Sequence, residues 1–312
     1  MFSVIFPGQG SQAVGMSSDL YAKFDIVKKL YKEADEVLNY PISKIILNGP
    51  KDELDLTENT QPSIFLVGYS IFQILKKEFD IDLNKAKFFA GHSLGEYTAL
   101  ACSGALDFAS TLKILKLRGS AMQTAVPRGE GGMLAILGSD INFIEKNFEE
   151  NKSQYECFIA NDNSNGQLVA SGTMENINKL SKDLTSKNIK NIKLSVSAPF
   201  HCNLMNKATE LMKSEIEKLE FKTFQTPLIS NVTALEIKDS SSLKKLLIQQ
   251  IESRVRWRES VLYMINNGVK QFVEIGPGKV LSGLIKRIDR NVKVSAINKE
   301  EDISIIKIND KF

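Results

Sequence analysis

The chain has few of the residues that build disulfide frameworks and metal sites. Its 312 residues include only three cysteines, Cys102, Cys157 and Cys202, and two histidines. The cysteines are odd in number and follow no metal-ligand spacing, which is typical of reduced thiols in a cytosol. Two histidines cannot supply a histidine-rich site. We therefore expect a cytoplasmic protein that binds no metal.

The chain also lacks a dominant charge and a long apolar run. Forty lysines and arginines oppose 37 aspartates and glutamates, which leaves a net charge of +3. A nucleic-acid partner is not expected from so balanced a charge, although a local basic cluster could attract an acidic protein. No apolar run reaches the roughly 18 residues of a membrane span. The first six residues have no basic flank, so we expect no secretory signal and no membrane partner.

The segment with the strongest chemical signal is Gly91-His-Ser-Leu-Gly95. It follows a short apolar run, 88–90, and precedes a helix-compatible segment, 96–103. The G-x-S-x-G pattern between a strand and a helix is typical of a nucleophile elbow, in which both glycines lack a Cβ because the turn is crowded. Ser93 is therefore a candidate nucleophile, and a purely structural turn is the alternative.

Two other glycine turns resemble phosphate-binding loops only weakly. Gly8, Gly10 and Ala13 match G-x-G-x-x-[GA], but residues 19–38 are predicted to be helical, and no second strand follows with an acidic residue. A loop whose N–H groups face Ser93 is the competing interpretation. The turn at 276–278 follows a strand and lacks the Walker pattern, which favours a simple strand-to-helix connection over a phosphate loop.

Arg118 lies on the apolar face of an amphipathic helix predicted over 108–126. It is four residues after Ile114 and three before Ala121, so it shares their face. A guanidinium keeps its proton, and a buried cation needs an anion or a path to the rim. A salt bridge to an internal carboxylate, snorkelling, and binding of a substrate anion all remain open.

His201 is the candidate base for a serine nucleophile. His92 is adjacent to Ser93, and the elbow directs its side chain elsewhere. His201 lies in Ala198-Pro-Phe-His-Cys202, at the junction of two predicted domains.

The periodicity predicts an α/β fold with an inserted subdomain. The order βαββαβ between Met133 and residue 197 is the ferredoxin-like motif. We expect residues 1–127 and 198–312 to form a large α/β-hydrolase-like domain with a mostly parallel sheet, and 128–197 to form the small subdomain. In the large domain we expect strands at 3–6, 88–90, 227–231, 271–275 and 292–296, helices at 19–38, 64–75 with Pro62 in its first turn, 96–103, 108–126, 205–219, 242–252 and 279–289, and a basic connection at 254–258. In the small subdomain we expect strands at 133–137, 155–161, 167–171 and 190–196 and helices at 140–150 and 174–187.

Five motifs in this order resemble the malonyl-CoA:acyl-carrier-protein transacylases and the acyltransferase domains of fatty-acid and polyketide synthases. They are Gly8-Gln-Gly-Ser-Gln12, Gly91-His-Ser-Leu-Gly-Glu-Tyr97, Arg118 in Leu-Arg-Gly, Pro199-Phe-His201 and Glu274-Ile-Gly-Pro-Gly278. The resemblance spans nearly the whole chain, and the combination is highly specific.

The resemblance implies roles for the residues at these positions. Ser93 would take the malonyl group and His201 would be its base. A main-chain carbonyl would orient the histidine, and it falls at about Gln250, with Gln249 as the adjacent alternative.

Further roles concern the substrate. The resemblance implies an oxyanion hole formed by the backbone N–H groups of Gln9 and Leu94, and a bidentate pair between Arg118 and the free malonyl carboxylate. Leu94 and Phe200 fit the malonyl-selective pattern.

The implied activity is transfer of malonyl from malonyl-CoA to the phosphopantetheine thiol of acyl carrier protein, with no cofactor. A serine hydrolase with water as acceptor and a non-catalytic carrier-docking module are the rivals. The set of Ser93, His201 and Arg118 argues against the module, and Arg118 argues against a general lipid esterase. For the acidic carrier we expect docking on Lys187, Lys190 and Lys193 on one side and on Lys286, Arg287 and Arg290 on the other.

Overall fold

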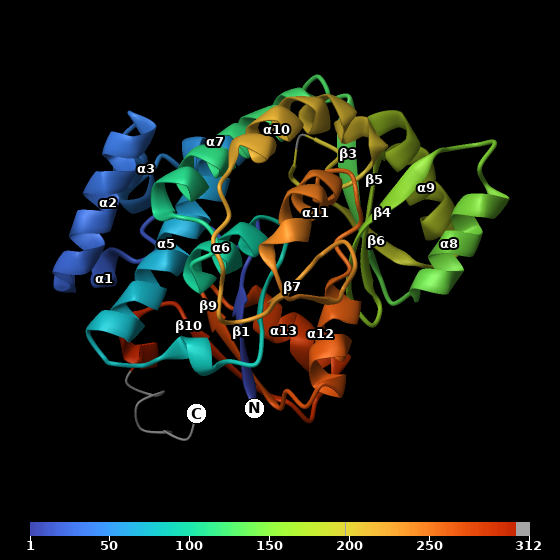
Figure 1. The fold of residues 1–312 in the computed structure, drawn as a ribbon. Coiled ribbons are helices and arrows are strands. Elements are labelled where there is room, and N and C mark those ends of the chain that lie inside the picture. The colour runs from blue at the N-terminus through green and yellow to red at the C-terminus, as the bar shows by residue number, and fades with distance from the viewer. Residues whose placement is uncertain (197, 304–312) are drawn as a thin grey trace.

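A computed structural model describes residues 1–196 and 198–303. Two sheets organise the chain (Figure 1). The large sheet has the strand order β10-β9-β1-β2-β7-β8, and its neighbours are parallel except for β7 and β8. Its strands are β1 (Phe2–Phe6), β2 (Phe89–Gly91), β7 (Leu228–Ile229), β8 (Glu236–Ile237), β9 (Gln271–Ile275) and β10 (Lys293–Ile297).

Helices cover both faces of the large sheet, which is why its central strands β1 and β2 are fully buried and almost entirely apolar rather than alternating with polar residues. Successive side chains of β1 point to opposite faces, so Phe6 packs in one apolar cluster and Ile5 in another. The Phe6 side is covered mainly by α5 and α6, and the Ile5 side by α12 and α13. The helices of this part are α1 (Ser18–Lys23), α2 (Asp25–Leu38), α3 (Ile42–Asn48), α4 (Lys51–Leu54), α5 (Thr57–Lys77), α6 (Leu94–Ser103), α7 (Phe108–Thr124), α10 (Asn206–Lys218), α11 (Leu243–Gln250), α12 (Trp257–Asn266) and α13 (Val280–Ile288).

The second sheet is antiparallel and carries its two helices on one side, as expected for βαββαβ. Its strand order is β4-β5-β3-β6. An apolar cluster of its own lies between this sheet and the helices. The elements are β3 (Gly131–Leu137), α8 (Ile141–Glu150), β4 (Cys157–Ser164), β5 (Gln167–Thr173), α9 (Met174–Ser186) and β6 (Lys190–Lys193). We propose that 128–197 is an inserted subdomain, although its last residue lies outside the described part of the chain.

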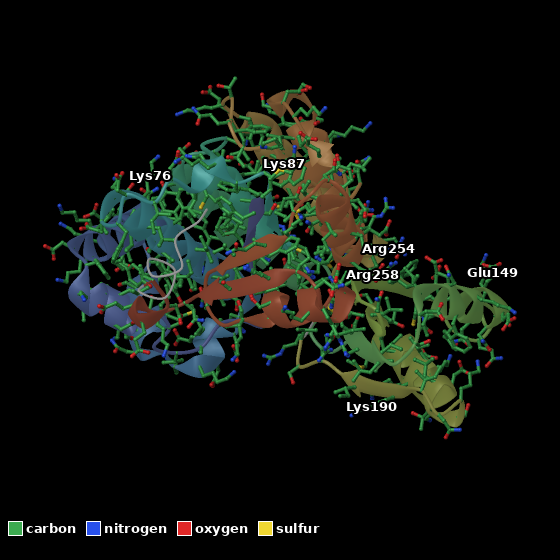
Figure 2. All side chains as sticks on the ribbon, turned by 90° about the horizontal axis from the view of Figure 1, so that it is seen from below. Lys76, Lys87, Glu149, Lys190, Arg254 and Arg258 are labelled. Carbon is green, nitrogen blue, oxygen red and sulfur yellow. The ribbon has the colours of Figure 1, made fainter. Side chains whose placement is uncertain are left out.

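The two parts are joined at the carboxyl end of β4. Val255 exchanges main-chain hydrogen bonds with Ala160 and Asp162, at 2.8 and 3.0 Å. The buried Asp162 carboxylate also accepts hydrogen bonds from Arg258, with an Nη2–Oδ2 distance of 2.8 Å. Figure 2 shows Arg254 and Arg258 at this junction, while Lys190 lies on the small part. The junction therefore holds β4 firmly beside the large sheet.

Three expectations about the elements were wrong. The helix over 19–38 is two helices, because the buried Phe24 adopts an extended conformation between them. The helix α5 begins at Thr57, so Pro62 lies beyond its first turn. Asn59 and Thr60 lie inside this helix, and their side chains donate to the main-chain carbonyls of Glu53 and Leu54.

The third error concerns the basic connection at 254–258. The helix α12 begins there at Trp257, which is fully buried in the cluster that also contains Ile5. Tertiary packing of the indole, together with arginines that pair with Asp162 and Glu259, allows a helix where the local composition suggests a loop. The short strand β8 was also not expected.

No helix within 1–196 or 198–303 is long and apolar enough to cross a membrane.

Candidate active site

The turn between β2 and α6 has the geometry of a nucleophile elbow. Ser93 has φ 54° and ψ −111°, a strained conformation for a residue with a Cβ. A Cβ on Gly91 would lie 1.9 Å from the main-chain carbon of Gly95, and a Cβ on Gly95 would lie 2.3 Å from the Phe6 oxygen. Both positions therefore require glycine.

Asn231, which the sequence did not indicate, holds the elbow in this conformation. Its Oδ1 accepts a hydrogen bond from the Ser93 N–H at 2.7 Å, and its Nδ2 donates to the Gly91 carbonyl at 2.7 Å. One buried side chain thus fixes the main chain on the N-terminal side of the strained residue. It comes from the loop after β7, the strand next to β2 in the sheet.

The structure brings His201 to Ser93. The Ser93 Oγ and the His201 Nε2 are 2.8 Å apart, and the His201 Nδ1 lies 2.9 Å from the main-chain oxygen of Gln250. A carbonyl can only accept, so Nδ1 carries the proton and Nε2 is left to accept one from Ser93. Burial, aided by the charge of Arg118, lowers the pKa of His201 to about 3. The imidazole is therefore neutral at pH 7.

His92 points away from this pair. Its Nε2 lies 2.9 Å from Asn163 Oδ1, and its ring packs near Trp257. The carbonyl beside His201 belongs to Gln250 and not to Gln249, which decides between the two adjacent residues.

Arg118 is buried beside the same hydroxyl, with 1% of its surface exposed. Its Nη1 donates to Gln61 Oε1 at 2.8 Å, and its Nη2 donates to Gln250 Oε1 at 2.9 Å and to Ser93 Oγ at 3.2 Å. In the described part of the chain, no carboxylate lies within 4.0 Å of the guanidinium, and its buried Nε has no partner. Neither an internal salt bridge nor snorkelling therefore explains this cation.

A cavity of about 460 Å³ opens over Ser93, His201 and Arg118. Its polar end also includes Gln9 and Leu94, so every residue predicted to contact the substrate lines one space. The apolar part of the wall comes from both parts of the molecule and consists of Met122, Met133, Leu194, Val196 and Phe200. A substrate in this cavity would have its reacting end at the elbow and its remaining length between the two sheets.

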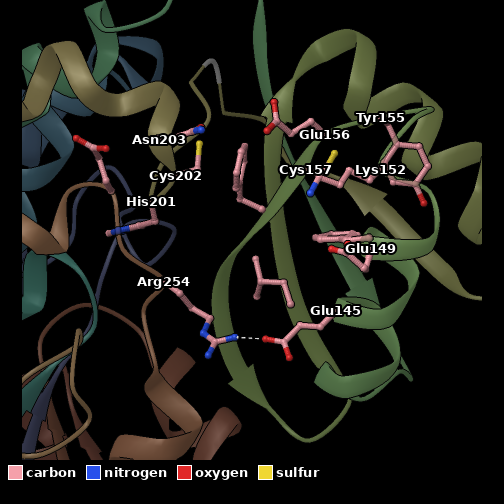
Figure 3. A pocket seen from close by; sticks show the side chains of 14 residues that line it. Glu145, Glu149, Lys152, Tyr155, Glu156, Cys157, His201, Cys202, Asn203 and Arg254 are labelled. Atoms are coloured by element: carbon pink, nitrogen blue, oxygen red, sulfur yellow. Dashed lines mark hydrogen bonds and ion pairs between the residues drawn. The ribbon is translucent and has the colours of Figure 1, made fainter.

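The cavity in Figure 3 is a different one, of about 620 Å³. It lies between α8, β4 and the segment at 201–203, and the Arg254–Glu145 ion pair crosses it at 2.8 Å. The ring of His201 points away from this space. The imidazole of His201 is therefore directed toward Ser93 and not into this cavity.

Both weak phosphate-loop interpretations fail in the structure. The loop at Gly8 packs on the elbow, where a Cβ would lie 2.6 Å from the His92 oxygen, and no strand follows β1 before β2. At the second turn, the Glu274 carboxylate accepts hydrogen bonds from the N–H groups of Leu281 and Ser282, at 3.0 and 2.7 Å. A carboxylate of the chain already occupies the place that a phosphate would take.

Sequence reasoning missed the residues that support this site. Gln61, Asn231 and the side chain of Gln250 have no motif of their own, and Glu96 lies in the elbow motif without a role that the sequence assigns to it. These residues meet only because three helices and a loop converge. The polar run at 57–61, all but one of its residues buried in α5, is the one signal that could have indicated Gln61. No cluster of three or more metal-ligating side chains occurs among the residues that the structure describes.

Comparison with known proteins gives a consistent result. The family model described as "Acyl transferase domain" matches residues 3–303. The malonyl CoA-acyl carrier protein transacylase of Bacillus subtilis is 40% identical over 304 residues, covering 96% of this chain and 94% of that protein. The Escherichia coli K12 protein of the same name is 37% identical, with coverage of 95% and 96%.

Solved structures agree. An acyl-carrier-protein S-malonyltransferase from Bartonella henselae matches with a TM-score of 0.95 at 37% identity, covering 98% of both chains. A malonyl-transacylase in complex with a type II polyketide-synthase acyl-carrier protein matches with a TM-score of 0.94 at 35% identity, covering 99% of both chains. The chain therefore belongs to the acyl transferase family and, within it, to the malonyl CoA-acyl carrier protein transacylases.

Proposed function

We propose that this protein transfers malonyl from malonyl-CoA to the phosphopantetheine thiol of acyl carrier protein, through an ester on Ser93, and so supplies fatty-acid elongation. The main support for the proposal is that two groups, an imidazole and a guanidinium, lie next to the Ser93 hydroxyl. A neutral imidazole lies 2.8 Å from Ser93 Oγ, and a buried guanidinium without a carboxylate partner lies 3.2 Å from it. One group activates the serine, and the other selects an acyl group that ends in a carboxylate.

In the first half-reaction, Ser93 Oγ bonds to the thioester carbon while its proton moves to His201 Nε2. The negative charge that develops on the carbonyl oxygen needs donors in place. Gln9 and Leu94 line the cavity, and among the described residues no hydrogen bond is found from the main-chain N–H of either. We assign them as the oxyanion hole. The C–S bond then breaks, and the CoA sulfur takes the proton from His201.

Arg118 is proposed to hold the free malonyl carboxylate. A guanidinium offers parallel N–H groups that fit a carboxylate in a bidentate pair. The buried Nε without a partner leaves one such donor unused in the free protein. Acetyl-CoA has no carboxylate at this position, so it cannot form the pair.

The second half-reaction reverses the first with a new thiol. The carrier's phosphopantetheine thiol gives its proton to His201, its sulfur attacks the ester carbon, and Ser93 recovers the proton as the malonyl thioester leaves. This chemistry needs no cofactor beyond the two substrates. We also propose that the enzyme is cytoplasmic, which the three buried free cysteines support.

Four of the six predicted docking residues already contact other groups of the chain. Lys187 contacts Asp183, Lys193 contacts Asn178, and Lys286 donates to the Val292 carbonyl at 2.6 Å. Arg287 contacts Gln167. Within the described residues, the side chains of Lys190 and Arg290 have no hydrogen-bond or ion-pair partner. Lys190 lies on β6, whose chain continues to Leu194 and Val196 in the cavity wall. We propose Lys190 as the first contact for the acidic carrier.

The intact mass of the protein after mixing with malonyl-CoA tests the proposal. We expect one added malonyl group, which maps to the peptide containing Ser93 and is absent in Ser93→Ala. Release of CoA without an adduct would instead indicate a hydrolase, and no release of CoA would reject both enzymes.

A further inference from the structure

Glu96 is a buried carboxyl group that the mechanism above does not use. It lies in the first turn of α6, three residues after Ser93, and 2% of its surface is exposed. Ser93 and Glu96 match the capping-box pattern S-x-x-E, in which the glutamate would accept from the Ser93 N–H and the serine oxygen from the Glu96 N–H. The structure does not form this box. Asn231 takes the Ser93 N–H, and Glu96 turns to Gln250.

The side-chain amide of Gln250 connects Glu96 to Arg118. Its Nε2 donates to Glu96 Oε2 at 2.6 Å and to the Ser93 carbonyl at 3.1 Å, while its Oε1 accepts from Arg118 at 2.9 Å. A carboxylate only accepts and a guanidinium only donates, so the two ends permit a single orientation of the amide. If the amide were flipped, its oxygen would face the Glu96 carboxylate and its NH₂ group would face the Arg118 guanidinium. Glu96 thus fixes which atom of Gln250 faces Arg118.

In the same arrangement, the positive charge of the Arg118 guanidinium is not neutralised by its direct hydrogen-bond partners. Its partners Gln61, Gln250 and Ser93 are all neutral, and the carboxyl of Glu96 is separated from Arg118 by one amide. The ionisable groups around Glu96 are Arg118 on α7, Tyr97 on its own helix, and His201 beyond Gln250. From the loop after β7, the main-chain N–H of Asn231 donates a hydrogen bond to Glu96. A substrate carboxylate would therefore bring a second negative charge to a buried site that holds one cation.

We propose that Glu96 is a positioning residue for Arg118, acting through the Gln250 amide, and that it takes up a proton when the substrate carboxylate binds. The inference rests on the proposed malonyl transfer. The Glu96 carboxyl is suited to this exchange: burial raises its pKa to about 7, against the opposing effects of Gln250, Asn231 and Arg118.

The direction of the pH dependence follows from the charges. Above pH 7, Glu96 is ionised in the free enzyme, and an arriving carboxylate disfavours that anion. Binding therefore raises the pKa of Glu96 further and draws a proton from solution. The preference for malonyl-CoA over acetyl-CoA, as a ratio of kcat/KM values, should rise as the pH falls from 8.5 to 6.5, by at most about tenfold per pH unit for one proton.

Two substitutions at Glu96 distinguish the effect of its charge from its effect on the orientation of the Gln250 amide. In Glu96→Gln the carboxamide oxygen can still accept from Gln250 and Asn231, so the malonyl preference should remain at the wild-type low-pH value and lose its pH dependence. In Glu96→Ala the amide of Gln250 is no longer locked, and the malonyl preference should be about tenfold lower than in Glu96→Gln, which also lacks the charge; a factor of ten corresponds to one pKa unit of interaction. Acetyl transfer should change little in either variant.

Glu274→Gln is the matched control, because Glu274 is an equally buried glutamate of β9 whose carboxylate accepts hydrogen bonds from the first N–H groups of α13. It should lower the melting temperature and keep the wild-type preference and pH dependence. A wild-type preference that is flat between pH 6.5 and 8.5, or equal losses of malonyl and acetyl transfer in Glu96→Ala, would overturn the proposal. A failure of the proposed function itself is distinct, because wild-type protein would then form no malonyl adduct at any pH. The wild-type profile needs no variant, so the proposal remains testable if Glu96→Ala does not fold.

Discussion

Arg118 offers the strongest test of substrate selection. The change is Arg118→Ala, which removes a guanidinium that has 1% of its surface exposed and neutral partners only. Hydrogen bonds to charged groups contribute about 1.5–3 kcal/mol each, so a bidentate pair is worth about 3–6 kcal/mol. Part of this is offset because Nη2 gives up its 3.2 Å contact with Ser93. At about 1.4 kcal/mol per factor of ten, malonyl transfer should fall by about two orders of magnitude or more.

The assay is kcat/KM for malonyl-CoA and acetyl-CoA with the wild type and the variant. Acetyl transfer should stay unchanged or improve, so the preference should flatten or reverse. Arg118→Lys should recover only part of the malonyl activity, because an ammonium replaces the planar fork with a point charge. Lys113→Ala, on the exposed side of the same helix, is the matched control and should behave as the wild type. Parallel losses for both thioesters would show that Arg118 is structural and would refute the reasoning.

Four further predictions concern the base, its pKa, the elbow and the docking surface. His201→Ala should slow acylation as severely as Ser93→Ala, and the double variant should lose little more, as stopped-flow release of CoA would show; additive losses would mean that the two residues do not act as a unit. Because burial and the Arg118 charge lower the pKa of His201 to about 3, acetyl-CoA activity should persist from pH 8 down to about pH 5 rather than decline near the ordinary value of about 6.5. Asn231→Ala should reduce the free energy of unfolding by about 2–4 kcal/mol, since it leaves two buried main-chain groups without partners, and an unchanged denaturation midpoint would contradict this. Lys190→Glu should slow transfer to acyl carrier protein and leave transfer to free pantetheine unchanged. Added salt should likewise slow only the transfer to the carrier, and equal effects on the two acceptors would remove the docking assignment.

The parts of the fold that the sequence predicts are those with local signals. The βαββαβ order follows from periodicities within single elements, and the elbow follows from two glycines around Ser93. Arg118 stands out because a cation on an apolar helix face conflicts with its neighbours. His201 follows from there being only two histidines, one of them next to the nucleophile.

The remaining features depend on contacts between distant residues. Asn231 meets Ser93 across 138 positions of sequence, and Gln250 meets Glu96 across 154. No local periodicity encodes such pairs, because they exist only when β7 and α11 are placed beside the elbow. Trp257 shows the same limit for secondary structure, since burial of one indole against the sheet outweighs a locally polar composition.

The most direct test of the central claim is the fate of a preformed malonyl-enzyme. Wild-type protein is loaded with malonyl-CoA, freed of CoA, and mixed either with acyl carrier protein bearing phosphopantetheine or with buffer, while intact mass is followed over time. We expect a long-lived adduct in buffer and rapid discharge to the carrier, with malonyl gained by the carrier as it is lost from Ser93. Equal rates of discharge with and without the carrier, and no malonyl on the carrier, would show that water is the acceptor and would contradict the account.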